Sequence, residues 1–188
     1  MKRIMWLVFL AALLPGLIAY TAVRPPEPGE KPPEIVLPAP SDRSDRIYLG
    51  APRTGFFYIS DLKIPVVLIE ILSIYCPYCQ KEAPNVNKLH EMIEKDPGLR
   101  GKIKIIGIGA GNSSFETAIF RKKYGIPFPI FPDPDFVIHQ QVGEVRTPYF
   151  IGVRNRPDGS SRIFYSNVGG FGDPGAFLDR IKQLSDLK

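Results

Sequence analysis

Two cysteines that directly follow the most apolar run in this 188-residue chain constrain its fold more than any other feature. The run over 66–72 (VVLIEIL) is rich in β-branched residues, and it predicts a strand buried on both faces. A helix is predicted over 77–95, since proline is favoured at the first helical position. A bridge between Cys76 and Cys79 would close almost no loop and would add little stability. These cysteines therefore serve chemistry or metal binding.

The predicted order of strand, Cys-x-x-Cys and helix assigns different roles to the two thiols. Cys76 comes just before a helix N-terminus, where unpaired N–H groups and the helix dipole favour a thiolate. We expect Cys76 to be the nucleophile. Cys79, one turn inside the helix, is expected to be less exposed and to resolve a mixed disulfide by attacking Cys76.

A Cys-x-x-Cys pair also occurs in zinc half-sites, and this alternative depends on further ligands. Zinc needs about four of them, and the other strong candidates, His90 and His139, fall at the end of the same helix and in a separate helix. Covalent haem would need a histidine where Gln80 stands. The sequence therefore predicts no metal and no cofactor other than a redox-active Cys76–Cys79 disulfide.

The first 46 residues are expected to lie outside the folded domain. Residues 4–23 carry no charge, and twenty helical residues span roughly 30 Å, the hydrocarbon core of a bilayer. Residues 1–23 are predicted to be a membrane anchor with Lys2 and Arg3 on the cytoplasmic side, or alternatively a cleaved signal peptide. The proline-rich stretch 24–46 is predicted to be an extended, solvated extracytoplasmic linker. The folded domain is then expected over 47–188.

Charge describes the chain as a whole, and periodicity describes the predicted domain. The net charge of +5 is spread among acidic residues without a basic stripe, so nucleic-acid binding is not expected. Alternating strands and helices that finish in a hairpin and a helix predict an α/β sandwich. The predicted strands are 66–72, 103–108, 129–131, 149–153 and 162–166, and the predicted helices are 77–95, 113–124, 135–142 and 174–187.

The stretch IEILSIYCPYCQKEAPNVNKL resembles the active-site segment of TlpA-like thioredoxins, the membrane-anchored reductases that include ResA and the cytochrome c maturation proteins. FRKKYGIPFPIFPDPD and VRTPYFIGV resemble the family's second half, so the likeness covers about 60–166. It implies a thioredoxin-like fold with a central mixed β-sheet flanked by helices. It also implies that Thr147-Pro148 is a cis-proline segment beside the disulfide, whose backbone can pair with an extended substrate. Pro77-Tyr78 is more similar to glutaredoxins and leaves the direction of electron flow open.

Two acidic residues near the cysteines are candidate site residues. Glu70 interrupts the apolar strand six residues before Cys76, where thioredoxins have a buried aspartate. Burial would raise its pKa and allow it to shuttle the proton of Cys79; the alternative is a solvent-facing residue at a strand end. Glu82 is expected one turn beyond Cys79 on the exposed side of the helix. By resemblance it tunes the cysteine pKa values, and otherwise it is a solvated first-turn acid.

Together these features predict an extracytoplasmic protein-disulfide oxidoreductase that works as a reductant. Its expected partners are a protein dithiol or disulfide substrate and a membrane-embedded electron donor. An oxidase or isomerase of the same fold remains an alternative, as does a non-catalytic binding module. A peroxiredoxin-like thiol peroxidase is a further alternative: Ser73 fits its pattern three residues before the reactive cysteine, but Ile69 stands where proline is needed.

Overall fold

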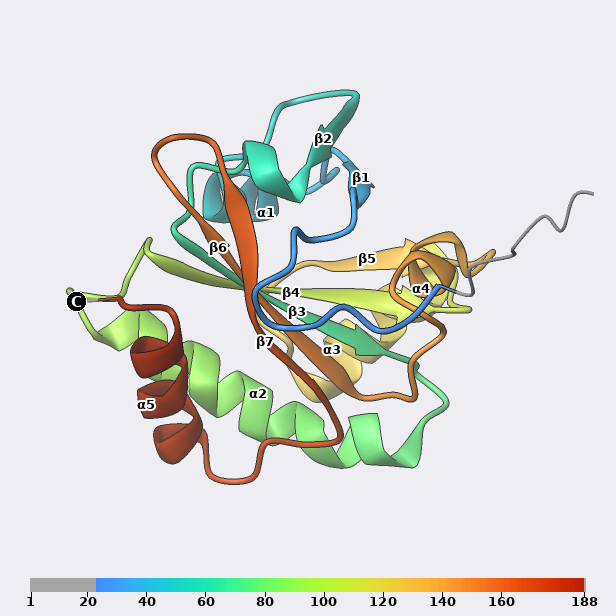
Figure 1. Ribbon diagram of the computed structural model, residues 1–188. Helices are drawn as coiled ribbons and strands as arrows, with labels where there is room; N and C mark the ends of the chain where they lie inside the picture. Colours follow the sequence, from blue (N-terminus) through green and yellow to red (C-terminus); the bar gives the residue numbers. More distant parts are fainter. Residues whose placement is uncertain (1–22, 188) are drawn as a thin grey trace, which may run out of the picture.

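A mixed five-stranded sheet in the order β5-β4-β3-β6-β7 forms the centre of the computed structural model, which describes residues 23–187 (Figure 1). The strands are β3 (Val66–Leu72), β4 (Ile103–Ala110), β5 (Ile130–Asp133), β6 (Tyr149–Asn155) and β7 (Ser161–Val168). β3 pairs in parallel with β4, and β4 in parallel with β5, whereas β6 runs antiparallel to both β3 and β7. All five strands lie close to their predicted positions.

The apolar run of β3 is explained by two separate cores. All seven of its residues are buried. Val67, Ile69 and Ile71 pack in one core, and Val66, Leu68 and Leu72 pack in the other. Because both faces of this strand are covered, its sequence is continuously apolar rather than alternating.

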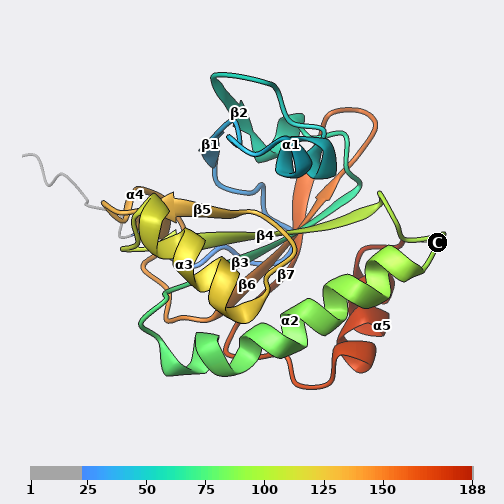
Figure 2. The ribbon, with the colours of Figure 1, turned by 180° about the vertical axis from the view of Figure 1, so that it is seen from behind.

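Helices and short strands cover the two faces of the sheet (Figure 2). One face packs against α2 (Pro77–Lys95), α3 (Ser114–Tyr124) and α5 (Pro174–Leu184). The other packs against α1 (Arg43–Leu49), the single turn η1 (Ile59–Asp61), α4 (Val137–Gln141) and an antiparallel pair of strands, β1 (Val36–Pro38) and β2 (Phe56–Tyr58). The observed α2 matches the predicted helix at both ends, whereas α5 ends three residues before the predicted 187.

The prediction that 24–46 is a solvated linker and that the folded domain begins at 47 is wrong. Ile35 and Leu37 are 2% and 0% exposed, and β1 pairs with β2. In α1, the buried Asp45 accepts two hydrogen bonds from Arg121 of α3, at 2.5 and 2.7 Å. Prolines indicate an extended backbone, but an extended segment can also dock on a sheet when it carries apolar side chains such as these.

The segment 23–35, which we call the strap, begins beside α4 and crosses the sheet before it reaches β1 (Figure 1). It adds to the free edge of β7, since Gly29 N–H donates to the Ile163 carbonyl at 2.8 Å and Ile163 N–H donates to the Glu30 carbonyl at 2.9 Å. Its first residues lie against Gly143, where any Cβ would collide with the backbone of Arg24. The strap is therefore in contact with the rest of the fold at its start and at its middle.

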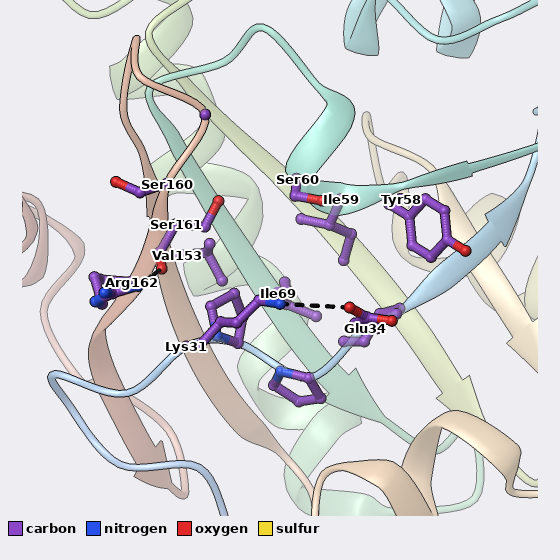
Figure 3. Close-up of a pocket in the computed structure, with 14 residues that line it drawn as sticks. Lys31, Glu34, Tyr58, Ile59, Ser60, Ile69, Val153, Ser160, Ser161 and Arg162 are labelled. Atoms are coloured by element: carbon purple, nitrogen blue, oxygen red, sulfur yellow. Dashed lines mark hydrogen bonds and ion pairs between the residues drawn. The ribbon is translucent and has the colours of Figure 1, made fainter.

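A hollow of about 450 Å³ remains between the strap and the sheet (Figure 3). Its floor includes Ile69 and Val153, and an ion pair of 3.4 Å between Lys31 and Glu34 lies along the strap. The cysteines and the other predicted site residues are absent from its lining.

The predicted membrane segment lies outside the described residues, apart from Val23 at its end. Within 23–187, no helix combines the length and the apolar character needed to cross a bilayer.

The contact between α1 and α3 predicts that the N-terminal part of the chain contributes to stability. Replacing Asp45 by Ala leaves the Arg121 guanidinium without its partner in a largely buried place, and we expect it to lower the free energy of unfolding by about 2–4 kcal/mol. Urea denaturation measures this change. The control is Asp186→Asn, which keeps a residue that tolerates the left-handed backbone there (φ 49°) and removes only an exposed ion pair with Arg154, so stability should change by less than about 0.5 kcal/mol. Equal effects of the two substitutions would contradict a structural role for α1.

Candidate active site

The two thiols lie at the start of α2, at the carboxyl end of β3. Cys76 occupies the N-cap position, and Pro77 begins the helix. The Cys76 side chain is half-buried, and its sulfur donates to the Thr147 carbonyl at 3.3 Å. Cys79 is only 1% exposed. Both thiols are free, so this is the dithiol form, with one sulfur accessible and the other behind it.

The two thiols have opposite pKa shifts. Burial alone would raise the pKa of Cys76, but hydrogen bonds donated to its sulfur by the Thr147 side chain, by the backbone and thiol of Cys79 and by the Tyr78 backbone outweigh it, so that this pKa is lowered. Burial raises the pKa of Cys79, and the charge of Glu70 raises it further. The accessible sulfur is therefore the better thiolate, and the buried sulfur holds its proton.

Glu70 is buried, at 4% exposed, between Gly107 of β4 and Phe150 of β6. Burial raises its pKa from the ordinary 4.5 to about 8, with a smaller contribution from the charge of Glu82. None of the residues 23–187 donates a hydrogen bond that would stabilise its carboxylate. The alternative of a solvent-facing strand end is wrong. A carboxyl group near Cys79 therefore titrates close to neutral pH.

The prediction that Glu82 lies on the exposed side of its helix is also wrong. Glu82 is 7% exposed, and its carboxylate accepts hydrogen bonds from Phe171 N–H at 3.0 Å and from Asn85 at 3.2 Å. The loop between β7 and α5 covers this turn of α2. A Cβ at Gly170 would collide with the carboxylate, so glycine there permits the close approach. The sequence contains no pattern that predicts this long-range contact.

The loop before β6 forms the other wall of the site. The Thr147-Pro148 peptide bond is cis and lies beside Cys76, as the resemblance implied. In the first turn of α2, Tyr78 is 74% exposed, and Pro77 before it is exposed as well. The structure thus gathers all the predicted site residues around the carboxyl end of β3.

Asn112, which the sequence did not single out, and Gln80, to which it assigned no structural role, hold the loop between β3 and α2. The buried Asn112 accepts from Ile74 N–H at 3.0 Å, and the Gln80 amide donates to the Ile74 carbonyl at 2.8 Å. The hydroxyl of Tyr75 donates to Glu116 at the start of α3. Asparagine after a strand rich in glycine is a weak signal, because the same composition occurs in ordinary turns.

Neither histidine lies with the cysteines. His90 packs between the rings of Tyr48 and Phe128, and the His139 ring nitrogen lies 2.8 Å from the Val145 carbonyl. Among the described residues, no three His, Cys, Asp or Glu side chains are grouped in a way that could hold a metal ion.

Several solved structures resemble this one. A Chlorobium tepidum protein described as a thiol:disulfide interchange protein DsbE has a TM-score of 0.64 and 16% identity, and the match covers 85% of this chain and 99% of that one. A secreted disulfide oxidoreductase of Mycobacterium tuberculosis has a TM-score of 0.56 and 18% identity over 80% of this chain and 96% of that one. A thioredoxin-like protein of Aeropyrum pernix has a TM-score of 0.54 and 16% identity, covering 80% and 89%.

These likenesses show that the fold is thioredoxin-like. No curated protein sequence matches the chain. Residues 54–157, more than half of the chain, match the AhpC/TSA family. The chain therefore belongs to the AhpC/TSA family.

Proposed function

We propose that this protein is a thiol–disulfide oxidoreductase that acts outside the cytoplasm and reduces disulfide bonds of other proteins through Cys76 and Cys79. The observation that carries the proposal is the asymmetry of the two thiols. Cys76 is accessible at a helix N-terminus and has a lowered pKa, while Cys79 behind it is buried and has a raised one. This is the arrangement that a nucleophile and a resolving thiol require.

The reaction balances within these residues and a substrate disulfide. The Cys76 thiolate attacks one substrate sulfur, the substrate S–S bond breaks, and the other sulfur leaves as a thiolate that takes up a proton from water. Cys79 then passes its proton to the Glu70 carboxylate and attacks the Cys76 sulfur. The mixed disulfide breaks, and the second substrate thiolate leaves. The substrate gains two electrons, and the protein is left with a Cys76–Cys79 disulfide.

The surroundings of Cys76 suit a polypeptide substrate. The Thr147 carbonyl already lies at the thiol, so the Thr147-Pro148 backbone is placed to pair with an extended segment like an added strand. Pro77 and Tyr78 follow Cys76 directly and are exposed on the first turn of α2. In this position they bind the substrate and take no part in electron transfer.

The proposed location outside the cytoplasm rests on the N-terminal sequence, and the proposed electron donor rests on that location. An uncharged segment over 4–23 would anchor or export the chain, and the domain would then work outside the cytoplasm. A reductant there must regain two electrons per turnover, which a membrane-embedded dithiol donor would supply. The reduction potential of the couple decides the direction: a value near −270 mV supports reduction, and one near −120 mV supports the oxidase alternative.

Membership of the AhpC/TSA family also raises thiol peroxidase activity as an alternative function. Position 69, seven residues before Cys76, is an isoleucine whose side chain packs in the core opposite to that of Cys79. It therefore does not shape the surroundings of the reactive sulfur. Consumption of hydrogen peroxide by the reduced protein at a rate above that with protein disulfides would favour the peroxidase over the disulfide reductase.

Because Cys76 is the nucleophile and Cys79 is the resolving thiol, replacing each by serine should give opposite results. With a disulfide-containing protein substrate, Cys79→Ser should accumulate a covalent complex through Cys76, because the resolving thiol is missing. Cys76→Ser should form no complex and show no turnover. Non-reducing electrophoresis and mass spectrometry measure both. Full biological activity of Cys76→Ser would instead indicate a non-catalytic binding module.

The buried carboxyl group predicts the pH dependence of resolution. With a pKa of about 8, Glu70 becomes an effective base as the pH rises from 6 to 9, so the resolution rate of the native protein should rise over that range. Glu70→Gln should lose this rise and be slower by roughly 100-fold at pH 9. Stopped-flow measurement of substrate thiol release follows the rate. An identical rate profile in the variant would rule out the proton shuttle.

The stability of the same variant is the control for intact folding. Folding raises the Glu70 pKa from 4.5 to about 8, so the native state binds more protons than the unfolded state in this window and loses stability as the pH rises through it. Glutamine carries no such charge. Glu70→Gln should therefore become more stable than the native protein above pH 5, by up to roughly 4 kcal/mol at pH 8.

A further inference from the structure

A second hollow, of about 500 Å³, adjoins the reactive thiol on the side of the loop before β6. Thr147, whose carbonyl lies 3.3 Å from the Cys76 sulfur, forms one end of it, and Tyr75 lies along its edge. Phe136 and Arg146 also line the hollow. We call this space the Phe136 hollow. Its size is within the range of sites that hold ligand groups.

The backbone of Phe136 has a conformation that a phenylalanine rarely adopts. Its φ of 59° lies in the left-handed region, which suits glycine or asparagine and is unfavourable for a bulky side chain. Residues held in this way are concentrated at binding and catalytic sites. The ring lies over Gly111, where a Cβ would collide with it, and yet 45% of Phe136 remains exposed. Core packing therefore does not account for a large apolar side chain at this position.

The Phe136 hollow also has a positive charge in its lining. Arg146 is exposed and makes no ion pair with any residue of 23–187. Of the other polar groups close by, His139 is engaged with the Val145 carbonyl and Glu116 with the Tyr75 hydroxyl. The hollow thus combines an aromatic wall with one unpaired cation.

We propose that the Phe136 hollow selects the substrate: it receives a large apolar side chain that flanks the target cysteine in an extended, acidic protein segment. This inference rests on the proposed function and names the substrate class for it. A segment paired with the Thr147 backbone alternates its side chains between two sides, so that one flanking side chain enters the hollow when the cysteine meets Cys76. Arg146 pairs with a carboxylate of the same segment. Phe136 is the specificity-determining residue.

The test uses the reduced full-length protein in single turnover, so that no separate electron donor is needed. The probes are four extended peptides, each with one internal disulfide, that combine either Phe or Ser beside the attacked cysteine with either Glu or Lys in the next positions. Each reaction oxidises the protein dithiol to a disulfide and reduces the peptide disulfide to two thiols. The second-order rate constant is measured by alkylation and mass spectrometry.

The native protein should reduce the Phe/Glu peptide roughly tenfold or more faster than the Ser/Glu peptide, and faster than the Phe/Lys peptide. Phe136→Gly should abolish the preference for Phe. The variant should still fold, because glycine adopts this φ without strain. Arg146→Gln should abolish the preference for Glu alone. The matched control is Phe115→Ser on α3, a residue that is 72% exposed and outside the hollow, and this variant should keep both preferences.

The experiment distinguishes failure of the proposed substrate selection from failure of the proposed function. Equal rates for Phe and Ser peptides in the native protein, or a preference for Phe that survives Phe136→Gly, would overturn the selection while leaving the oxidoreductase proposal standing. Reduction of none of the four peptides would overturn the proposed function itself, and the selection with it.

Discussion

The double pairing of β3 is the constraint on which the site depends. Hydrogen bonds from β4 on one side and from β6 on the other fix this strand along nearly its whole length, and both of its faces are buried. Its carboxyl end therefore presents the reactive cysteine at a fixed place, where α2 begins. β6 starts with the residues after Pro148, so the same pairing also fixes the loop that contacts Cys76 from the other side. Nucleophile and substrate-pairing backbone thus share one rigid support.

Burial then sets the acid–base properties of two groups behind the reactive thiol, Glu70 and Cys79. Glu82 has hydrogen-bond donors in Phe171 and Asn85, whereas Glu70 is surrounded by apolar neighbours and has a raised pKa. Burial is the main cause of the raised pKa values of Glu70 and Cys79, and the charges of Glu82 and Glu70 add to them, respectively. Neutral Glu70 leaves the resolving thiol protonated, and its ionised form is the nearby base that resolution needs. β3 thus supports the site and also supplies its acid–base group, Glu70.

Local sequence patterns were enough to predict the central strand, α2 and the order of the remaining elements, because periodicity, caps and prolines act within a few residues. Cys76 and Cys79 were predictable for the same reason, and their neighbours followed from resemblance. The errors concern contacts made across the fold. The burial of Glu82 depends on a loop almost ninety residues away, and the docking of Ile35 and Leu37 depends on a sheet that composition does not describe. Phe136 is conspicuous only once its backbone conformation is known.

The docking of the strap has a geometric consequence for any segment that precedes it. Arg24 lies against Gly143, only four residues before Thr147 in the loop that contacts the reactive sulfur. Whatever the residues before 23 are attached to, their point of attachment is on the rim of the active site and not at the far end of the sheet. A segment that precedes residue 23 would therefore leave the domain on the same side as the loop that contacts Cys76.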